Sequence, residues 1–384
     1  MTDARDKRTI AISLPSTGRE EWEALREPLE TGWLTQGPKV AAFEKAFAER
    51  HRVRHALATT SCTTALHLAL AALGVGPGDE VIVPAFTWIA TANVVLYTGA
   101  RPVFVDVNPR TFNLDPGTLA VAVTERTRAV IPVHLFGLCA DVDAIRAALP
   151  AGVALVEDAA CAAGAAYKGR PAGGLGDAAA FSFHPRKSIT TGEGGMLTTN
   201  AEALAETANA LRNHGASVSE EIRHHGPRPY LLPDFNLLGF NYRMTDLQGA
   251  VGLVQLGKLD AFVAERREWA GVYRRELAGL DWLRLPEEPE GGAHAWQAFV
   301  TYVEPEGAPL PRNEIMARLQ QRGISTRPGT HAVHTLNYYR ERFGTRPEDF
   351  PAAWACDRNT MALPLHNRMT EADYSYVIDA LRAL

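Results

Sequence analysis

Lys187 lies in a segment whose residue types suit covalent chemistry on carbonyl compounds. Residues 178–183 form a short apolar run, and residues 184–195 form a polar stretch with three glycines. A lysine at the exit of a buried strand is partly desolvated, which lowers the pKa of its amine and makes the amine a nucleophile towards carbonyl carbon. The pattern therefore predicts a reactive amine at Lys187 if the other groups of a carbonyl-binding site accompany it.

Three further positions supply such groups. Asp158 follows an apolar run, and a carboxylate at that depth needs a cation or hydrogen-bond donors. Trp88 follows another apolar run, and its flat indole can stack on an aromatic ring. Residues 59–64, all Thr, Ser or Cys, precede an apolar helical pattern, and backbone N–H groups at a helix N-terminus bind phosphate. Together with Lys187, these residues indicate pyridoxal 5′-phosphate (PLP) held as a Schiff base.

Each position also has a purely structural interpretation. Residues 59–64 could do no more than cap a helix, and Asp158 could cap the segment that follows it. A large aromatic such as Trp88 is most often part of a core. His331 and His334 have the spacing of two metal ligands on one helix face, but no nearby Asp, Glu or Cys completes a site, so we expect no metal.

Alternating strands and helices must position these residues. Apolar runs predict strands at 80–84, 102–106, 129–133, 153–156 and 178–183, and helical patterns lie at 63–73, 89–97, 141–149 and 201–213. This order predicts a mostly parallel, doubly wound α/β sheet. Active sites of such sheets lie at the carboxyl ends of the strands, where Trp88, Asp158 and Lys187 fall.

The rest of the chain predicts a second domain. A long helical pattern at 245–280 is expected to link a large α/β domain, residues 1–255 with an N-terminal arm, to a smaller α+β domain at 256–384. Residues 215–233 are polar and rich in His, Gly and Pro, which predicts a long loop with a function.

Composition narrows the class of protein. The chain has 384 residues, of which 46% are hydrophobic, and a net charge of −5, so we expect a large core and no nucleic-acid partner. No apolar run is long enough to cross a membrane, and none resembles a signal peptide. The four cysteines match no metal pattern, which favours a reduced, cytoplasmic protein.

Several ordered segments resemble one known family. They span the chain from Gly32-Trp33-Leu34-Thr35-Gln36-Gly37-Pro38 to Leu363-Pro364-Leu365, and the most specific are residues 76–84, 157–160, 181–184, 239–245 and 326–328. The chain is similar to the DegT/DnrJ/EryC1/StrS family of PLP-dependent sugar aminotransferases, which belongs to the fold-type I aspartate aminotransferase superfamily. The resemblance implies that fold, with PLP or its amino form as the cofactor.

The resemblance also implies roles by position. Lys187 would carry the Schiff base and Asp158 would hold the ring nitrogen, and Trp88 and Cys161 would lie against the ring. The Cys62 backbone, Thr63 and Ser182 would hold the phosphate, and Asn241 would reach the phosphate of a neighbouring subunit in a homodimer with shared active sites. The residues implied for the sugar pocket are Trp33, Thr35, His184 and His331, with the loop at 215–233.

Two positions depart from the family pattern. The phosphate turn is often Ser-Gly-Thr but reads Ser61-Cys62-Thr63 here, and cysteine restricts the backbone more than glycine does. Cys161 stands where the family often has Gln or His. A thiol is a weak hydrogen-bonding group, so any contact from this position to the cofactor hydroxyl is expected to be weak.

The resemblance implies transfer of an amino group from L-glutamate to a keto sugar, in amino sugar biosynthesis for lipopolysaccharide or antibiotics. The expected acceptor is a nucleoside-diphosphate-linked 4-keto-6-deoxy or 3-keto sugar. A keto-cyclitol acceptor and a PLP-dependent sugar dehydratase are the alternatives, and a PLP-binding regulator without catalysis is a third. Dehydrating relatives have histidine at the Schiff-base position, so Lys187 favours amino transfer. The nucleotide and the ring carbon stay open.

Overall fold

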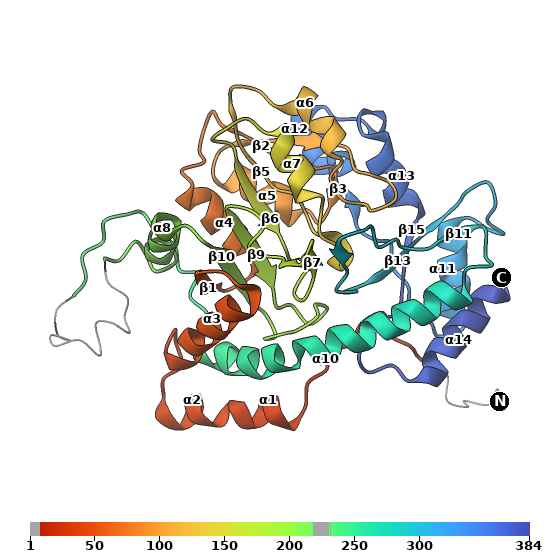
Figure 1. The fold of residues 1–384 in the computed structure, drawn as a ribbon, viewed down its shortest axis with the longest axis horizontal. Helices are drawn as coiled ribbons and strands as arrows, with labels where there is room; N and C mark the ends of the chain where they lie inside the picture. Colours follow the sequence, from red (N-terminus) through yellow and green to blue (C-terminus); the bar gives the residue numbers. More distant parts are fainter. Residues whose placement is uncertain (1–7, 218–229, 231) are drawn as a thin grey trace.

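Seven strands form the central sheet of the computed structural model, which describes residues 8–217, 230 and 232–384. They are β1 (His55–Thr59), β2 (Glu80–Pro84), β4 (Arg101–Val105), β5 (Thr127–Val130), β6 (Ala154–Asp158), β9 (Ala178–Ser182) and β10 (Gly195–Thr199). Their order in the sheet is β1-β10-β9-β6-β5-β2-β4 (Figure 1). Neighbours from β9 to β4 are parallel, whereas β10 is antiparallel to both β9 and β1. The predicted mostly parallel sheet is confirmed.

Successive residues of these strands are buried on opposite faces of the sheet. In β2, Val81 packs into one apolar cluster and Ile82 into another. In β9, Ala180 and Phe181 are divided in the same way. Because side chains alternate along a strand, a sheet covered on both faces needs apolar residues at every position. This requirement explains why the continuous apolar runs of the sequence are strands.

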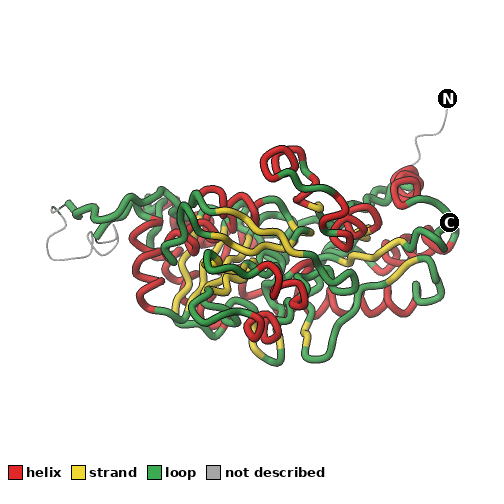
Figure 2. The backbone as a smooth tube through the Cα atoms, turned by 90° about the horizontal axis from the view of Figure 1, so that it is seen from above, coloured by secondary structure: helices red, strands yellow, loops and turns green. Residues whose placement is uncertain are grey.

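Helices cover both faces of the sheet (Figure 2). One face packs against α4 (Cys62–Ala72), α5 (Ala90–Tyr97) and α8 (Glu202–Arg212). The other packs against α3 (Pro38–His51), α6 (Leu119–Ala122), α7 (Val142–Ala148) and α10 (Asp246–Glu276). The sheet is therefore doubly wound, as the alternation of elements predicts.

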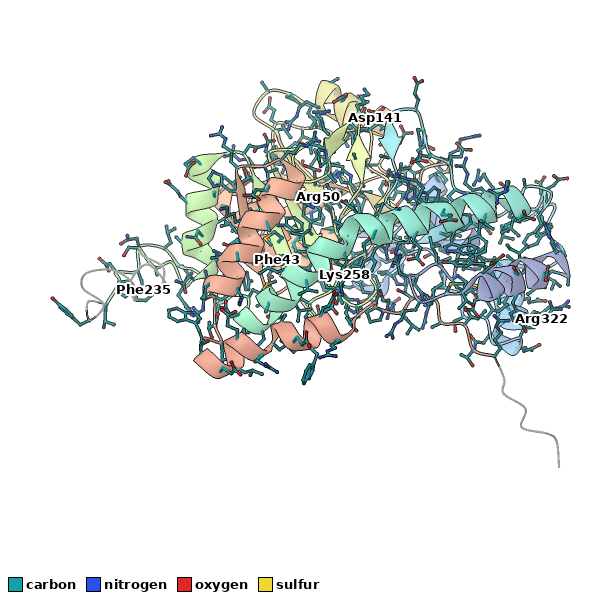
Figure 3. The ribbon with its side chains drawn as sticks, turned by 60° about the horizontal axis from the view of Figure 1, so that its bottom comes forward. Phe43, Arg50, Asp141, Phe235, Lys258 and Arg322 are labelled. Atoms are coloured by element: carbon teal, nitrogen blue, oxygen red, sulfur yellow. The ribbon has the colours of Figure 1, made fainter. Side chains whose placement is uncertain are left out.

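The long helix α10 runs along the base of the molecule in Figure 1 and reaches from the central sheet to the C-terminal part. It begins with a capping box at Thr245. It packs closely on α3 at Gly249, where a Cβ would lie only 2.7 Å from the Val40 nitrogen. Figure 3 shows Lys258 on α10, and its Nζ lies 2.7 Å from Oε1 of Glu21 in α1 (Arg19–Ala24). This helix therefore ties the N-terminal helices to the sheet.

The C-terminal part has its own antiparallel sheet, ordered β11 (Leu283–Arg284), β13 (Phe299–Val303) and β15 (Thr360–Leu363). Its helices are α11 (Arg312–Gln321), α12 (Asn337–Phe343), α13 (Pro351–Asn359) and α14 (Glu371–Arg382). Ile10 bridges Ile324, so the first described residues also lie against this part. The domain division proposed between residues 255 and 256 falls inside α10 and stays a prediction.

Short elements complete the described chain. They are α2 (Arg26–Thr31), β3 (Phe86–Thr87), β7 (Ala166–Tyr167), β8 (Arg170–Pro171), β12 (Gly292–Ala293), β14 (His331–Ala332) and the 3₁₀ turns Pro116–Thr118, Leu135–Gly137, Val333–Thr335 and Pro347–Asp349. Of these, β3 and β14 pair with each other and join the region after β2 to the C-terminal part. None of the helices described is long and apolar enough to cross a membrane.

Candidate active site

The carboxyl ends of β6 and β9 and the start of α4 meet at one edge of the sheet. β6 ends at Asp158, β9 ends at Ser182, and Asp158 lies in register with Ala180. Cys62 is the first residue of α4, and its Sγ lies 3.5 Å from the Ala180 carbonyl oxygen and 4.0 Å from Oδ1 of Asp158. The loop after β9 brings Lys187 to the same edge, so the structure gathers residues that are far apart in the sequence.

A tight turn holds Lys187 in place. The Lys187 N–H donates to the His184 carbonyl oxygen at 2.9 Å, and the Arg186 N–H donates to Nδ1 of His184 at 3.2 Å. The side-chain amide of Gln297 donates to the Arg186 carbonyl oxygen at 2.8 Å. A residue from the C-terminal part of the chain therefore helps to fix this loop.

The Lys187 amine lies among acidic and polarisable groups. Its Nζ is 3.2 Å from Sγ of Cys161. Burial lowers the pKa of the Lys187 amine, but the neighbouring Cys161, Cys62 and Asp158 favour its charged form and raise that pKa above its ordinary value. The pKa lowering expected from desolvation alone is therefore wrong for Lys187.

Asp158 is a buried carboxylate held by neutral donors. Its Oδ2 accepts a hydrogen bond from Oγ1 of Thr91 at 2.7 Å, and its Oδ1 accepts from the Ala160 N–H at 3.2 Å. Burial raises the pKa of Asp158, and these hydrogen bonds and the charge of Lys187 offset that rise only in part. Asp158 does cap the turn that follows it, and its carboxylate also favours an added cationic partner.

The N-terminus of α4 offers backbone donors to an anion. Ser61 is the N-cap, since its Oγ accepts from the Thr64 N–H at 3.2 Å and its N–H donates to Oγ1 of Thr64 at 3.0 Å. Over the described part of the chain, the N–H groups of Cys62 and Thr63 have no acceptor. The capping interpretation is thus correct for Ser61, and two outward donors remain for a phosphate.

Two residues of the neighbouring strands close this cradle. Gly195 begins β10 in register with Ser182 at the end of β9. A Cβ at Gly195 would lie 2.3 Å from the Ser61 carbonyl carbon, so only glycine allows β10 to approach the start of α4. The Ser182 hydroxyl accepts from the His184 N–H at 3.4 Å. Burial lowers the pKa of His184, which is half-buried beside this cradle.

Trp88 and His331 lie together beside the segment that follows β2. Thr87 pairs with His331 through strands β3 and β14. The rings of Trp88 and His331 have centroids 5.7 Å apart and are tilted by 40°. Trp88 is 62% exposed, so it is a surface aromatic and the core interpretation of this residue is wrong. The C-terminal part of the chain thereby adds a histidine beside the predicted cofactor site.

The N-terminal loop is fixed to the segment before α10. Thr35 bridges Thr245, and the Trp33 indole N–H donates to the Thr35 carbonyl oxygen at 3.2 Å. The amide side chain of Gln248, in the first turn of α10, donates to the Glu193 carbonyl oxygen at 2.6 Å. The loop that carries Lys187 and the loop that carries Trp33 are therefore joined through α10.

Asn241 is exposed and bridges Asn213. Its expected contact with a second subunit stays a prediction. Of the loop predicted at residues 215–233, residues 218–229 and 231 lie outside the described residues, and the sugar-binding role expected of the loop also stays a prediction.

Two sets of buried polar residues lie near the site and are not predicted from the sequence. Thr87 and Thr91 have their Oγ1 atoms 3.0 Å apart and lead to Asp158. Glu157 and His134 are fully buried, with Nε2 of His134 2.9 Å from Oε2 of Glu157. The only signal in the sequence for the first set is the four-residue spacing of Thr87 and Thr91, because Asp158 lies on a distant segment.

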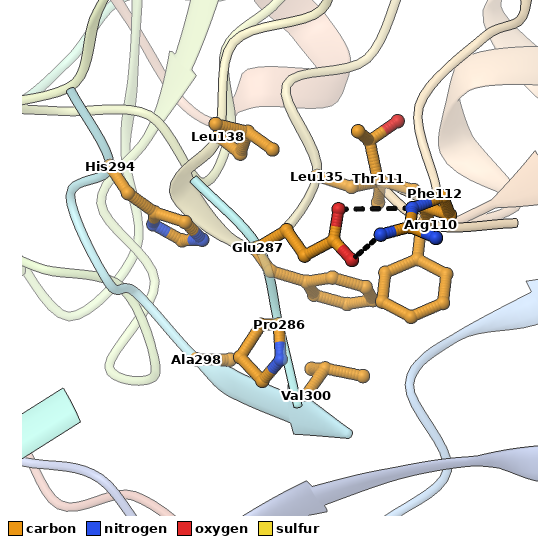
Figure 4. A pocket seen from close by; sticks show the side chains of 11 residues that line it. Arg110, Thr111, Phe112, Leu135, Leu138, Pro286, Glu287, His294, Ala298 and Val300 are labelled. Carbon is orange, nitrogen blue, oxygen red and sulfur yellow. Dashed lines mark hydrogen bonds and ion pairs between the residues drawn. The ribbon is translucent and has the colours of Figure 1, made fainter. Parts of the chain in front are cut away.

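Two concave features lie away from Lys187. Figure 4 shows a cavity of about 10 Å³ beside His294 and Leu138, with the ion pair of Arg110 and Glu287 across it. This volume suits one water molecule and no sugar. A wider cleft of about 440 Å³ lies at the amino ends of β2 and β4, the edge opposite Asp158. The active site is therefore identified by the chemistry of its residues and not by either of these cavities.

No group of His, Cys, Asp and Glu able to hold a metal ion occurs among the residues described.

The residues at the carboxyl edge fit PLP. Lys187 offers an amine for its aldehyde, Asp158 offers a buried carboxylate short of a cation for its ring nitrogen, and the start of α4 offers N–H groups for its phosphate. This fold and this set of residues define a PLP-dependent transferase of fold type I.

Comparison with known proteins gives the family. The sequence model of the DegT/DnrJ/EryC1/StrS aminotransferase family matches residues 15–382, and the chain belongs to this family. It is 43% identical over 375 residues to the spore coat polysaccharide biosynthesis protein SpsC of Bacillus subtilis, covering 97% of this chain and 96% of SpsC. It is 42% identical over 375 residues to the GDP-perosamine synthase of Caulobacter vibrioides, covering 97% of each.

The fold agrees with solved structures of the same class. The putative sugar aminotransferase Spr1654 from Streptococcus pneumoniae, in its PMP form, has a TM-score of 0.91 and 29% identity, with 98% of each chain covered. Its PLP form has a TM-score of 0.90. These comparisons confirm the expected family, the fold-type I architecture, the aminotransferase class and PLP as the cofactor.

Proposed function

We propose that this enzyme moves an amino group from L-glutamate to a keto sugar linked to a nucleoside diphosphate, with a 4-keto-6-deoxy sugar as the first choice and a 3-keto sugar as the second. The observation that carries the proposal is the Lys187 amine beside the buried Asp158 carboxylate at the carboxyl edge of the sheet. The similarity to a GDP-perosamine synthase supports a nucleotide-linked acceptor.

Lys187 is the proposed catalytic residue. When bound, PLP supplies a carbonyl carbon that binds amines covalently and a ring that accepts electrons from the bond being broken. The Lys187 Nζ would hold that carbon between turnovers and, once freed by the amino donor, would remove the proton from the donor's α-carbon. The same nitrogen would return a proton when the sugar receives the amine.

The other groups bind and orient. Asp158 holds the proton on the ring nitrogen, which keeps the ring able to accept electrons. The N–H groups of Cys62 and Thr63 bind the phosphate together with the Ser182 hydroxyl. Trp88 would cover one face of the ring, and Cys161 lies beside the Lys187 amine.

The proposed sugar site uses Trp33, Thr35, His184 and His331. His331 is the best supported of these, because its strand pairing places it against Trp88. We further propose a homodimer in which Asn241 of one subunit reaches the phosphate site of the other. The exposure of Asn241 supports this role. The four free cysteines favour a reducing compartment, so the proposed location is the cytoplasm.

The test is an activity panel. The protein with PLP and L-glutamate is mixed with dTDP-, UDP- and GDP-linked 4-keto-6-deoxy sugars, and release of 2-oxoglutarate is measured. One of these sugars should give release that depends on both substrates and is absent in Lys187→Ala. Sugar turnover without 2-oxoglutarate would instead mean dehydration, and would overturn the proposal.

Borohydride labelling tests the cofactor site separately from the choice of sugar. Reduction of the PLP-loaded protein should leave a pyridoxyl group on Lys187, found by peptide mass spectrometry. A label at any other lysine would show that the amine is misassigned.

A further inference from the structure

The carboxylate of Asp158 has few partners for a buried charge. Thr91 donates to its Oδ2 at 2.7 Å, the Ala160 N–H donates to its Oδ1 at 3.2 Å, and the Cys62 thiol is a weak third donor at 4.0 Å. No ion pair within 4.0 Å is formed by Asp158 with any described residue. The Thr91 hydroxyl is therefore the shortest and strongest contact that favours the ionised form.

A second hydroxyl stands behind the first. Thr87 Oγ1 lies 3.0 Å from Thr91 Oγ1, and both residues are fully buried. A hydroxyl has one proton to donate and lone pairs with which to accept. When Thr91 donates to Asp158, its oxygen is left to accept the proton of Thr87, so both O–H dipoles point towards the carboxylate. Hydrogen bonds aligned in this way polarise one another and strengthen the last one in the chain.

The surrounding elements explain why this chain of hydroxyls is well placed. Thr91 lies in the first turn of α5, where the helix dipole also favours a nearby negative charge. Thr87 lies in β3, which pairs with His331, and Trp88 follows it. One short segment, residues 87–91, therefore carries both Trp88 and the two hydroxyls that lead to Asp158.

We propose that Thr91, supported by Thr87, is a positioning residue of this aminotransferase, which keeps Asp158 ionised and oriented to receive the protonated ring nitrogen of PLP. This inference rests on the proposed role of Asp158. It gives the Thr91 hydroxyl a function beyond packing, because a methyl group of the same size would fill the space without donating.

The other titratable groups around Asp158 stay the same when Thr91 is substituted, so a change in the pKa of Asp158 can be measured. Lys187 faces it from the loop after β9, His134 from the segment after β5, and Cys62 from α4. Cys161 acts on the neighbouring Lys187. None of these groups is changed by a substitution at Thr91. Loss of the hydrogen bond to the charged form raises the pKa of Asp158, so protonation begins at a higher pH as the pH falls.

The experiment measures PLP affinity as a function of pH, by equilibrium dialysis of the full chain, for Thr91→Val and Thr91→Ser. In Thr91→Val, PLP should bind about tenfold more weakly at neutral pH. The pH at which the affinity falls to half on the acid side should also rise by about one unit. A shift of one pKa unit corresponds to about the free energy of one such hydrogen bond. Thr91→Ser restores the hydroxyl and should restore both values.

Thr301→Val is the matched control. Thr301 is also fully buried and donates from its hydroxyl, to the Met361 carbonyl oxygen at 2.8 Å, but it lies in the C-terminal sheet. It should lose thermal stability and keep the wild-type pH midpoint. If Thr91→Val behaves in the same way as Thr301→Val, the hydroxyl is merely structural and the inference is overturned.

Two further measurements distinguish failure of this inference from failure of folding or of the proposed function. If Thr91→Val does not fold, Thr87→Val is measured instead and should give a smaller shift in the same direction, whereas no shift would refute the chain of hydroxyls. Borohydride labelling of Lys187 in the wild type is measured in parallel. A wild type that fails to label would contradict the proposed function itself, and a labelled wild type with an unshifted Thr91→Val would contradict only this inference.

Discussion

The Lys187 amine and the Cys161 thiol are in contact, with Nζ 3.2 Å from Sγ. Cys161 follows the strand that ends at Asp158, and Lys187 follows the strand beside it, so the contact depends on the parallel pairing of β6 and β9. The family often has Gln or His at this position, and here a thiol lies against the amine instead.

The contact predicts a change in amine reactivity when the thiol is removed. Cys161 raises the pKa of Lys187, so Cys161→Ala should lower that pKa while burial still acts on the amine. A lower pKa leaves more neutral amine at a given pH, and the midpoint of modification by trinitrobenzenesulfonate should move to lower pH. The measurement uses PLP-free protein and peptide mass spectrometry at Lys187.

Cys356→Ala is the control for this prediction, because Cys356 is a buried thiol in α13 that is not among the groups acting on the Lys187 amine. It should leave the midpoint at Lys187 unchanged. An identical midpoint in Cys161→Ala and the wild type would show that the thiol does not influence the amine.

Removal of the Asp158 charge should slow the reaction greatly. Asp158→Asn keeps the shape of the side chain but cannot hold the proton on the ring nitrogen as an anion does. We expect kcat to fall by ~10²–10³ or more, on the scale of other losses of charge stabilisation. Single-turnover kinetics with L-glutamate measure the proton-removal step directly, and a rate near that of the wild type would remove Asp158 from the proposed mechanism.

The positions of Lys187 and Asp158 could be predicted because Asp158 ends one strand and Lys187 lies in the loop after another, and both strands are apolar runs buried on two faces. Strand β10 was missed, because Gly195–Thr199 begins with glycine and ends in threonines and so resembles a loop. The raised pKa of Lys187 was missed for another reason. Cys62 and Cys161 are far from Lys187 along the chain, and only the completed sheet brings their sulfur atoms near the amine.

The contact between Thr91 and Asp158 was hidden in the same way. It joins residues 67 positions apart. A threonine in the first turn of a short apolar helix gives no sign of a carboxylate partner, and the sequence order of the two segments does not reveal that they meet.

Glu157 should contribute strongly to stability. Its Oε2 accepts from the Gly173 N–H and contacts Nε2 of His134, and its Oε1 accepts from the N–H groups of Leu175 and Gly176. Glu157→Gln puts an amide among these donors, so we expect the free energy of unfolding to fall by about 3 kcal/mol. Urea unfolding followed by fluorescence measures this, with the exposed Glu206→Gln as a control that should change little.

The effect of Glu157 should depend on pH. Burial raises the pKa of Glu157, but the contacts with His134 and the backbone N–H groups outweigh burial and lower it below 4.5. A lowered folded-state pKa stabilises the protein fully above the unfolded-state pKa, and this stability is lost as the pH falls through the folded-state value. The difference between the wild type and Glu157→Gln should therefore shrink below about pH 4.5. A difference that stays constant there would show that the charge of Glu157 is not the cause.

The close approach of β10 to α4 predicts that Gly195 is essential to the phosphate cradle. A Cβ at this position would lie 2.3 Å from the Ser61 carbonyl carbon and 2.5 Å from the Cys62 nitrogen, and both are backbone atoms that cannot turn aside. Gly195→Ala must therefore push the start of α4 away from the strand. The N–H groups of Cys62 and Thr63 then lose their shared direction, and PLP should bind at least tenfold more weakly while Lys187 itself is unchanged.

Gly271→Ala is the matched control for Gly195→Ala, because a Cβ at Gly271 would meet no atom within 4 Å and the residue lies within α10. It should keep the wild-type PLP affinity and equal or raise the melting temperature, since alanine favours a helix over glycine. Equilibrium dialysis with PLP and with inorganic phosphate separates loss of the anion site from loss of the amine. Weaker binding of both ligands by Gly195→Ala places the damage at the cradle, whereas unchanged phosphate binding would mean that the N-terminus of α4 is not the anion site.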